Sequence, residues 1–166
     1  TIGRRIARRM ALNQIGRMSD YLDFLSTNAD ELSELSKDML IGVTSFFRDP
    51  DAFQKLELEI IPSIFANLQP QDEFRAWVAG CATGEEVYSL AMLVFEEAER
   101  RNFKGKITLF ATDVHRESLD YASAGLYELS RLSGLSSRRI SRFFREEIGN
   151  HFRICPELRG LVVFAQ

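Results

Sequence analysis

The chain of 166 residues is long enough for one ordinary domain or for one domain with a small appendage. Its hydrophobic content of 45% and its 13 phenylalanines supply enough apolar surface for a core, which excludes a disordered tail. A net charge of −3 disfavours a nucleic-acid-binding protein. Cys81 and Cys155 lie far apart and form neither a disulfide framework nor a metal-ligand pair, so we expect a reducing compartment and no metal site.

Charge is distributed unevenly along the chain. Residues 1–18 contain five arginines and no acidic residue, and four of them form pairs four residues apart on one broad helix face: Arg4, Arg5, Arg8 and Arg9. Such a run is commonly only a solvated surface, but a basic face also fits an acidic partner. No apolar stretch approaches the roughly 18 residues of a membrane span, and no signal-peptide pattern is present, so we expect a cytoplasmic protein without membrane insertion.

The first part of the chain has the pattern of helices. Apolar residues recur at near-helical spacing, and we predict a small all-helical domain over residues 1–41. Gly42 and Pro50 lie at the two ends of the next segment. Both residue types interrupt helices, so the helical pattern is expected to stop there. Residues 42–69 are therefore predicted to form a linker and an amphipathic helix that begins at Pro50.

From residue 70 onward the pattern alternates between strands and helices. We predict strands and helices in turn over residues 74–78, 85–101, 106–111 and 116–123. A strand, a glycine turn, a helix and a second strand indicate a βαβ unit, so residues 70–166 are predicted to belong to an α/β sheet with parallel strands.

The last third of the chain is predicted to form a small antiparallel β-subdomain at about residues 127–165. A helix is expected over residues 136–147, and short strands over 151–154 and 161–165 on either side of a turn at Pro156. The remaining strands of the parallel sheet are then expected beyond Gln166.

The most informative motif is Ala-Gly-Cys-Ala-Thr-Gly-Glu-Glu at residues 79–86, which includes Gly80. A glycine turn after the first strand of a βαβ unit brings a ligand close to the backbone N–H groups of a helix N-terminus. Phosphate-loop and dinucleotide patterns are absent, because Glu85 follows the last glycine and the three-glycine spacing is missing. Glu85 and Glu86 would repel a pyrophosphate but suit an ammonium or sulfonium group. Alternatively, both acids only stabilise the helix N-terminus.

Two further segments carry candidate binding residues. Asp113 ends the second strand, where open α/β folds bind ribose hydroxyls, although it could instead cap the following helix. Arg48 ends the segment Thr-Ser-Phe-Phe-Arg that begins at Thr44. Arg48 could bind a carboxylate through a bidentate fork with Thr44 supplying a hydroxyl, or it could be a solvated residue beside two phenylalanines.

Four segments, in this order, closely resemble the CheR family of chemotaxis protein-glutamate O-methyltransferases: residues 4–10, 43–49, 80–91 and 111–114. The resemblance runs over essentially the whole chain. It implies an α/β protein in which a small N-terminal all-helical domain precedes a truncated Rossmann-like methyltransferase domain with an antiparallel β-subdomain insert. It also implies methyl transfer from S-adenosylmethionine to glutamate carboxylates of chemoreceptors, with S-adenosylhomocysteine as the product.

The resemblance also implies roles for individual residues. Gly42 departs from the family, in which an Asn that touches the cofactor is common at this position. The residues that match the family's cofactor-binding motifs are Thr44, Arg48, Gly80, Glu85, Glu86 and Asp113. The residues that match the basic face presented to the acidic helical bundle of the receptor are Arg4, Arg5, Arg8 and Arg9.

The family continues past the strand at residues 161–164 into further cofactor-binding residues, so we expect this chain to be a fragment that lacks about half of the pocket. A glutamate carboxylate is already ionised at neutral pH, so methyl transfer needs no general base and no catalytic residue is predicted here. The single glycine of residues 145–151 leaves little slack for a peptide-binding strand edge, which indicates peptide-independent recognition. The alternative function is a non-catalytic module that binds S-adenosylmethionine or scaffolds a signalling array.

Overall fold

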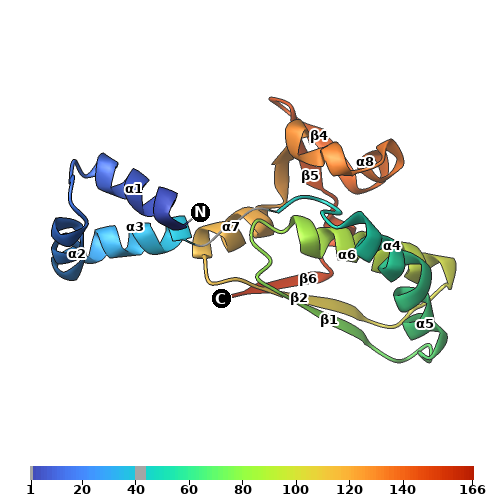
Figure 1. The fold of residues 1–166 in the computed structure, drawn as a ribbon. Helices are drawn as coiled ribbons and strands as arrows, with labels where there is room; N and C mark the ends of the chain where they lie inside the picture. Colours follow the sequence, from blue (N-terminus) through green and yellow to red (C-terminus); the bar gives the residue numbers. More distant parts are fainter. Residues whose placement is uncertain (1, 40–43) are drawn as a thin grey trace. The chain divides into compact units, whose positions relative to one another are not determined.

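A computed structural model describes residues 2–39 and 44–166 (Figure 1). The chain divides into two compact units, Thr1–Gly42 and Val43–Gln166. Gly42, which departs from the family pattern, lies outside the described residues. In the part of the chain that the structure describes, no helix has the length and apolar character needed to cross a membrane.

The first unit, the helical unit, contains α1 (Ile2–Leu12), α2 (Met18–Thr27) and α3 (Ala29–Met39). Asn28 precedes α3 and its side-chain oxygen accepts a hydrogen bond from the backbone N–H of Glu31 at 3.0 Å, which satisfies a free donor of the first turn. No residue of α1 is buried, and the buried residues of α2 and α3 are Tyr21 and Glu31. The centre of this unit is therefore polar.

The second unit, the α/β unit, is built on a parallel sheet. Its described strands are β1 (Phe74–Ala79), β2 (Ile107–Thr112) and β6 (Val162–Ala165), in the order β1-β2-β6. The prediction that residues 161–165 belong to the antiparallel insert is wrong, because β6 pairs in parallel with β2. The alternation of side chains is the same for both kinds of partner, so the local pattern could not choose between them. The short helix α9 (Pro156–Arg159) precedes β6 and leads the chain back to the sheet.

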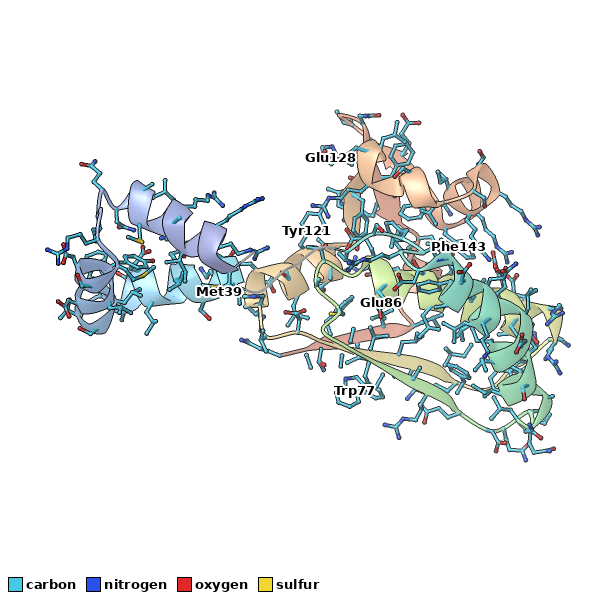
Figure 2. All side chains as sticks on the ribbon, viewed as in Figure 1. Met39, Trp77, Glu86, Tyr121, Glu128 and Phe143 are labelled. Carbon is cyan, nitrogen blue, oxygen red and sulfur yellow. The ribbon has the colours of Figure 1, made fainter. Side chains whose placement is uncertain are left out.

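Helices cover one face of this sheet. The helix after β1, α6 (Glu85–Arg100), lies between the sheet and the β-subdomain in Figure 1 and is buried along much of its length. The helix after β2 is α7 (Arg116–Ala124). On the other face, Trp77 is 69% exposed, and Figure 2 shows its side chain projecting from the sheet.

A continuous helical segment precedes β1. It consists of α4 (Pro50–Lys55), the π-helical turn η1 (Leu56–Ile60) and α5 (Ile61–Ala66). Pro62 has no N–H to donate, and in a regular α-helix its ring would clash with the carbonyl group of Leu58. The wider π-helical turn stands directly before this proline and relieves the clash.

The β-subdomain contains an antiparallel sheet and two short helices. Its strands are β3 (Leu126–Glu128), β4 (Phe144–Glu147) and β5 (His151–Ile154), in the order β3-β5-β4, with the 3₁₀ helix η2 (Leu129–Gly134) and α8 (Ser137–Phe143) between β3 and β4. The predicted helix over residues 136–147 is therefore wrong after Phe143. The turn that follows β4 has φ of +79° at Gly149 and +62° at Asn150, and these left-handed residues allow a tight hairpin.

Candidate functional site

The glycine turn joins β1 to α6. Gly84 has φ of +94°, and a Cβ placed there would stand 2.8 Å from the Cβ of Ala122 and 2.9 Å from the hydroxyl of Tyr127. Gly80 has φ of +71°, but a Cβ placed there would meet nothing within 4 Å. Position 84 therefore accepts only glycine, because the turn packs there against Ala122 and Tyr127. The space beside Gly80 is open.

Asp113 links this turn to the end of β2. Its Oδ2 accepts a hydrogen bond from the N–H of Ala82 at 2.8 Å, and its Oδ1 accepts one from the N–H of His115 at 2.9 Å. The contact with His115 is a local turn before α7; it does not cap the helix as the alternative predicted, because the N-cap residue is His115 and it receives no side-chain cap. The contact with Ala82 joins the loops that follow β1 and β2. Each carboxylate oxygen can accept more than one hydrogen bond, so the half-buried Asp113 keeps capacity for a ligand hydroxyl.

The two adjacent glutamates of the motif have different environments. Glu85 is 1% exposed, and its carboxylate accepts hydrogen bonds from Thr83 Oγ1 at 2.6 Å and from Arg131 Nη1 at 2.7 Å. Glu86 is exposed in the first turn of α6 (Figure 2). Glu85 was predicted to contact the cofactor, but its carboxylate is directed into the protein. Glu86 is the acid of this pair that faces solvent.

Phe46 anchors the segment that contains Thr44 and Arg48. Its ring is 1% exposed and packs edge-on against Tyr127 and Phe144, with centroid distances of 5.1 and 5.7 Å. The next residue, Phe47, donates its backbone N–H to Ser89 Oγ at 3.0 Å, one turn into α6.

This anchoring places the segment beside the first turns of α6, whose N-terminus is the glycine turn. Thr44 is half-buried and Arg48 is exposed. The structure thus brings Gly80, Glu86 and Asp113 to the glycine turn, and the segment with Thr44 and Arg48 to the adjoining part of α6.

Cys81 lies inside the glycine turn but is not suited to act as a nucleophile. Its side chain is 0% exposed, and burial raises the pKa of its thiol to about 11, with a further contribution from the negative charges of Asp113 and Glu86. A thiol with this pKa stays protonated at neutral pH, whereas the thiolate is the nucleophile.

The four arginines of α1 do not share one exposed face as predicted. Arg9 is only 14% exposed and donates its Nε to Glu31 Oε1 at 3.0 Å, and Arg5 donates to the backbone carbonyl of Asp38. Arg4 and Arg8 are exposed. Residues four apart on a helix share a face, and the face of Arg5 and Arg9 packs against α3. The exposed basic face of α1 is therefore formed by Arg4 and Arg8.

Sequence reasoning missed Tyr127 and Arg131. Tyr127 is fully buried and donates its hydroxyl to the backbone carbonyl of Thr83 at 2.7 Å. Arg131 reaches Glu85 from η2, 46 residues later in the chain. Contacts over such separations have no local signature, so neither residue could be found from spacing.

The residues of the site fit S-adenosylmethionine by their chemistry. An exposed carboxylate at Glu86 suits a cationic group, and a half-buried carboxylate at Asp113 suits hydroxyl groups. The open space above Gly80 allows a ligand to approach the turn. S-adenosylmethionine carries ammonium, sulfonium and ribose hydroxyl groups, and it has no phosphate.

The βαβ unit with its acidic glycine turn, together with the separate helical unit, has the architecture and the chemistry expected of an S-adenosylmethionine-binding domain preceded by an all-helical domain. Residues 42–166 match the CheR methyltransferase SAM-binding domain, and residues 1–40 match the CheR methyltransferase all-alpha domain. The chain belongs to the CheR methyltransferase family, and S-adenosylmethionine is the cofactor of its SAM-binding domain. These findings confirm the predicted family, fold class and cofactor.

The chain is also similar in sequence to individual bacterial proteins. The chain is 41% identical over 166 residues to an uncharacterized 104.1 kDa protein of Rhodobacter capsulatus, in a match that covers 100% of this chain and 17% of that protein. It is 30% identical over 163 residues to the chemotaxis protein methyltransferase of Salmonella typhimurium, covering 95% of this chain and 52% of the relative. It is 29% identical over 167 residues to chemotaxis protein methyltransferase 1 of Pseudomonas aeruginosa, covering 98% and 61%. The chain spans little more than half of these two chemotaxis relatives.

Proposed function

We propose that the protein containing this chain transfers a methyl group from S-adenosylmethionine to glutamate carboxylates of chemoreceptors in the cytoplasm. The observation that carries the proposal is the exposed Glu86 at an open glycine turn, beside the half-buried Asp113, in a chain of the CheR methyltransferase family. Similarity to chemotaxis protein methyltransferases supports the assignment to chemotaxis.

Five residues form this chain's share of the cofactor site. Glu86 binds a cationic group of the cofactor, and Asp113 accepts hydrogen bonds from ribose hydroxyls. Arg48 binds the cofactor carboxylate through charge-assisted hydrogen bonds, and Thr44 adds a hydroxyl. Gly80 leaves room for the ligand against the backbone.

The reaction needs orientation rather than acid–base catalysis. S-adenosylmethionine supplies an activated methyl group on a sulfonium. The accepting glutamate is ionised at neutral pH, so it attacks without a general base. The rate enhancement is expected to arise from holding the methyl group and the accepting carboxylate in line. The protonated thiol of Cys81 does not compete as a methyl acceptor.

Receptor recognition is assigned to the exposed basic face of α1, formed by Arg4 and Arg8. Their positive charges suit the acidic helical bundle of a chemoreceptor. We assign no role to a receptor peptide. The edge strand β4 exposes three charged residues, Arg145, Glu146 and Glu147, and charged edges disfavour the addition of another strand.

Calorimetric titration with S-adenosylmethionine, followed by transfer of a labelled methyl group to receptor glutamates, tests the proposal. Arg48→Ala is expected to weaken cofactor binding by about 1.5–3 kcal/mol, the range for hydrogen bonds to charged groups. Arg116→Ala is the matched control, because Arg116 is 72% exposed and its recorded ion pair is with Asp120 of the same helix. Binding without methyl transfer would support the non-catalytic module instead. Absence of binding by the wild-type protein would refute both methyl transfer and a module that binds S-adenosylmethionine, and would leave the scaffolding function.

A further inference from the structure

The carboxylate of Glu85 is buried at the first residue of α6. A buried carboxylate is costly unless it is paired and hydrogen-bonded. The positive partner recorded for Glu85 is Arg131, whose Nη1 lies 2.7 Å from Glu85 Oε1, while Thr83 Oγ1 donates to the other oxygen at 2.6 Å. An arginine outside the strand and helix that flank the glycine turn therefore contributes to holding the turn.

Arg131 connects three parts of the α/β unit. It belongs to η2, which follows β3 at the start of the β-subdomain, and its guanidinium lies 5.3 Å from the ring centroid of Tyr121 in α7. The Tyr121 ring fixes the direction of the guanidinium through a cation–π contact. Arg131 Nη1 is also 3.5 Å from Thr83 Oγ1. One side chain thus holds the last residues of the turn from the β-subdomain.

A second contact fixes the same turn. The hydroxyl of Tyr127 donates to the carbonyl of Thr83, and Gly84 packs against this hydroxyl so closely that no Cβ would fit. Thr83 and Glu85 are thereby held on either side of Gly84. Because Glu85 is held inward, its neighbour Glu86, one residue and about 100° further around α6, is directed outward.

We propose that Arg131 is a positioning residue for cofactor binding, which acts through Glu85 to hold the glycine turn and to keep Glu86 directed toward the ligand. This proposal rests on the proposed function only for the identity of the ligand, S-adenosylmethionine. The contact between Arg131 and Glu85 joins two protein side chains and does not depend on which ligand binds. Arg131 itself is not assigned a contact with the cofactor.

The test compares two arginine variants in the protein that contains residues 1–166. Arg131→Ala leaves Glu85 buried without its positive partner, whereas Arg142→Ala removes the ion pair with Glu99, a half-exposed residue near the far end of α6. Arg131→Ala is expected to raise the dissociation constant for S-adenosylmethionine about tenfold, because the buried carboxylate of Glu85 loses its charged hydrogen-bond partner and the turn is held less firmly. Arg142→Ala is expected to leave it unchanged, with the same binding stoichiometry in both variants.

Two further variants show whether Arg131 acts through Glu85. Arg131→Lys keeps the charge and is expected to restore part of the affinity, even where Arg131→Ala folds poorly. In a Glu85→Gln background, Arg131→Ala is expected to have a smaller effect than in the wild type, because the charge pair is already lost and only a neutral hydrogen bond from Arg131 remains to be removed. An undiminished loss in that background, or an unchanged dissociation constant in Arg131→Ala, would overturn the proposal.

Hydrogen exchange separates this proposal from the proposed function. Backbone amides of residues 80–86 are expected to exchange faster in Arg131→Ala than in the wild type without any cofactor, while amides near residue 100 keep their rates. If the wild-type protein binds no S-adenosylmethionine, the proposed function fails, and faster exchange at the turn still supports the positioning role. Unchanged exchange at residues 80–86 would show that Arg131 does not hold the turn.

Discussion

The helical unit and the α/β unit are stabilised by different kinds of contact. In the helical unit, the buried residues among 2–39 are a tyrosine and a glutamate. In the α/β unit, apolar residues form two buried clusters, and aromatic rings link the linker segment to the β-subdomain. Apolar burial depends on packed volume and is insensitive to pH, whereas a charged cluster depends on the ionisation of its members. The two units should therefore respond differently to mutation and to acid.

The charged cluster of the helical unit is formed by Arg9, Tyr21 and Glu31. Arg9 donates to Glu31, and the Tyr21 hydroxyl donates to Glu31 Oε1 at 2.7 Å. The hydrogen bonds from Arg9 lower the pKa of Glu31 to about 2, against the effect of burial. Burial and the bond to Glu31 raise the pKa of Tyr21 to about 12. One residue from each helix contributes, so the cluster joins α1, α2 and α3.

The largest expected effect comes from the apolar core of the α/β unit. Phe46→Ala should cost about 3–5 kcal/mol of that unit's stability, because it removes a fully buried ring and leaves a cavity between Tyr127 and Phe144. The free energy of unfolding is measured by denaturant titration, with the fluorescence of Trp77, the chain's single tryptophan, as the signal. Phe110→Ala is the control, since Phe110 is only half-buried. Equal losses in the two variants would contradict the central place given to Phe46.

The next effect is in the helical unit. Arg9→Ala should destabilise it by about 1.5–3 kcal/mol, the range for hydrogen bonds to a charged group, because the buried Glu31 loses its cation. Hydrogen exchange over residues 2–39 in the whole protein measures the loss. Arg8→Ala, one position earlier and exposed, is the matched control and should stay within about 0.5 kcal/mol of the wild type. Similar losses of stability in Arg9→Ala and Arg8→Ala would contradict a specific contribution of the Arg9–Glu31 pair to the helical unit.

The contrast between the units also explains what the sequence could predict. α6 was predicted to within one residue, because Gly84 and the apolar period that follows are local signals. β4 was predicted as helix, and β6 was given the wrong partner, because strand pairing is decided by distant residues. In the candidate site, Glu86 and Asp113 were predicted from local motifs, and their binding roles stay predictions. The Arg131–Glu85 and Arg9–Glu31 pairs join residues 46 and 22 positions apart, and no local pattern indicates them.

Acid should weaken the helical unit through Glu31. The pKa of Glu31 in the folded chain, about 2, lies below its ordinary value of 4.5, so its contribution is complete above pH 4.5 and is lost as the pH falls toward 2. By pH 3.5 the loss should be roughly 1 kcal/mol. Hydrogen exchange over residues 2–39 between pH 5 and pH 3, compared with Glu31→Gln, measures it. The two proteins should converge as the pH falls, and parallel pH profiles would refute the assignment.

The smallest effect on stability, and the sharpest on function, is expected from the exposed face of α1. Arg4→Glu with Arg8→Glu should change stability by less than about 0.5 kcal/mol, because both side chains are exposed. Receptor methylation should fall in this variant while affinity for S-adenosylmethionine stays the same. The wild-type rate should also fall with added salt, because screening weakens the attraction between the basic face and an acidic receptor.

The matched double variant, Arg5→Glu with Arg9→Glu, separates recognition from folding. It places negative charge beside Glu31 and the carbonyl group of Asp38, so it should disrupt the helical unit itself, which hydrogen exchange over residues 2–39 would detect. The Arg4 and Arg8 variant should keep wild-type exchange and lose only methylation of the receptor. If that variant methylates receptors at the normal rate, or if the wild-type rate is insensitive to salt, then Arg4 and Arg8 are solvated residues and the receptor binds elsewhere.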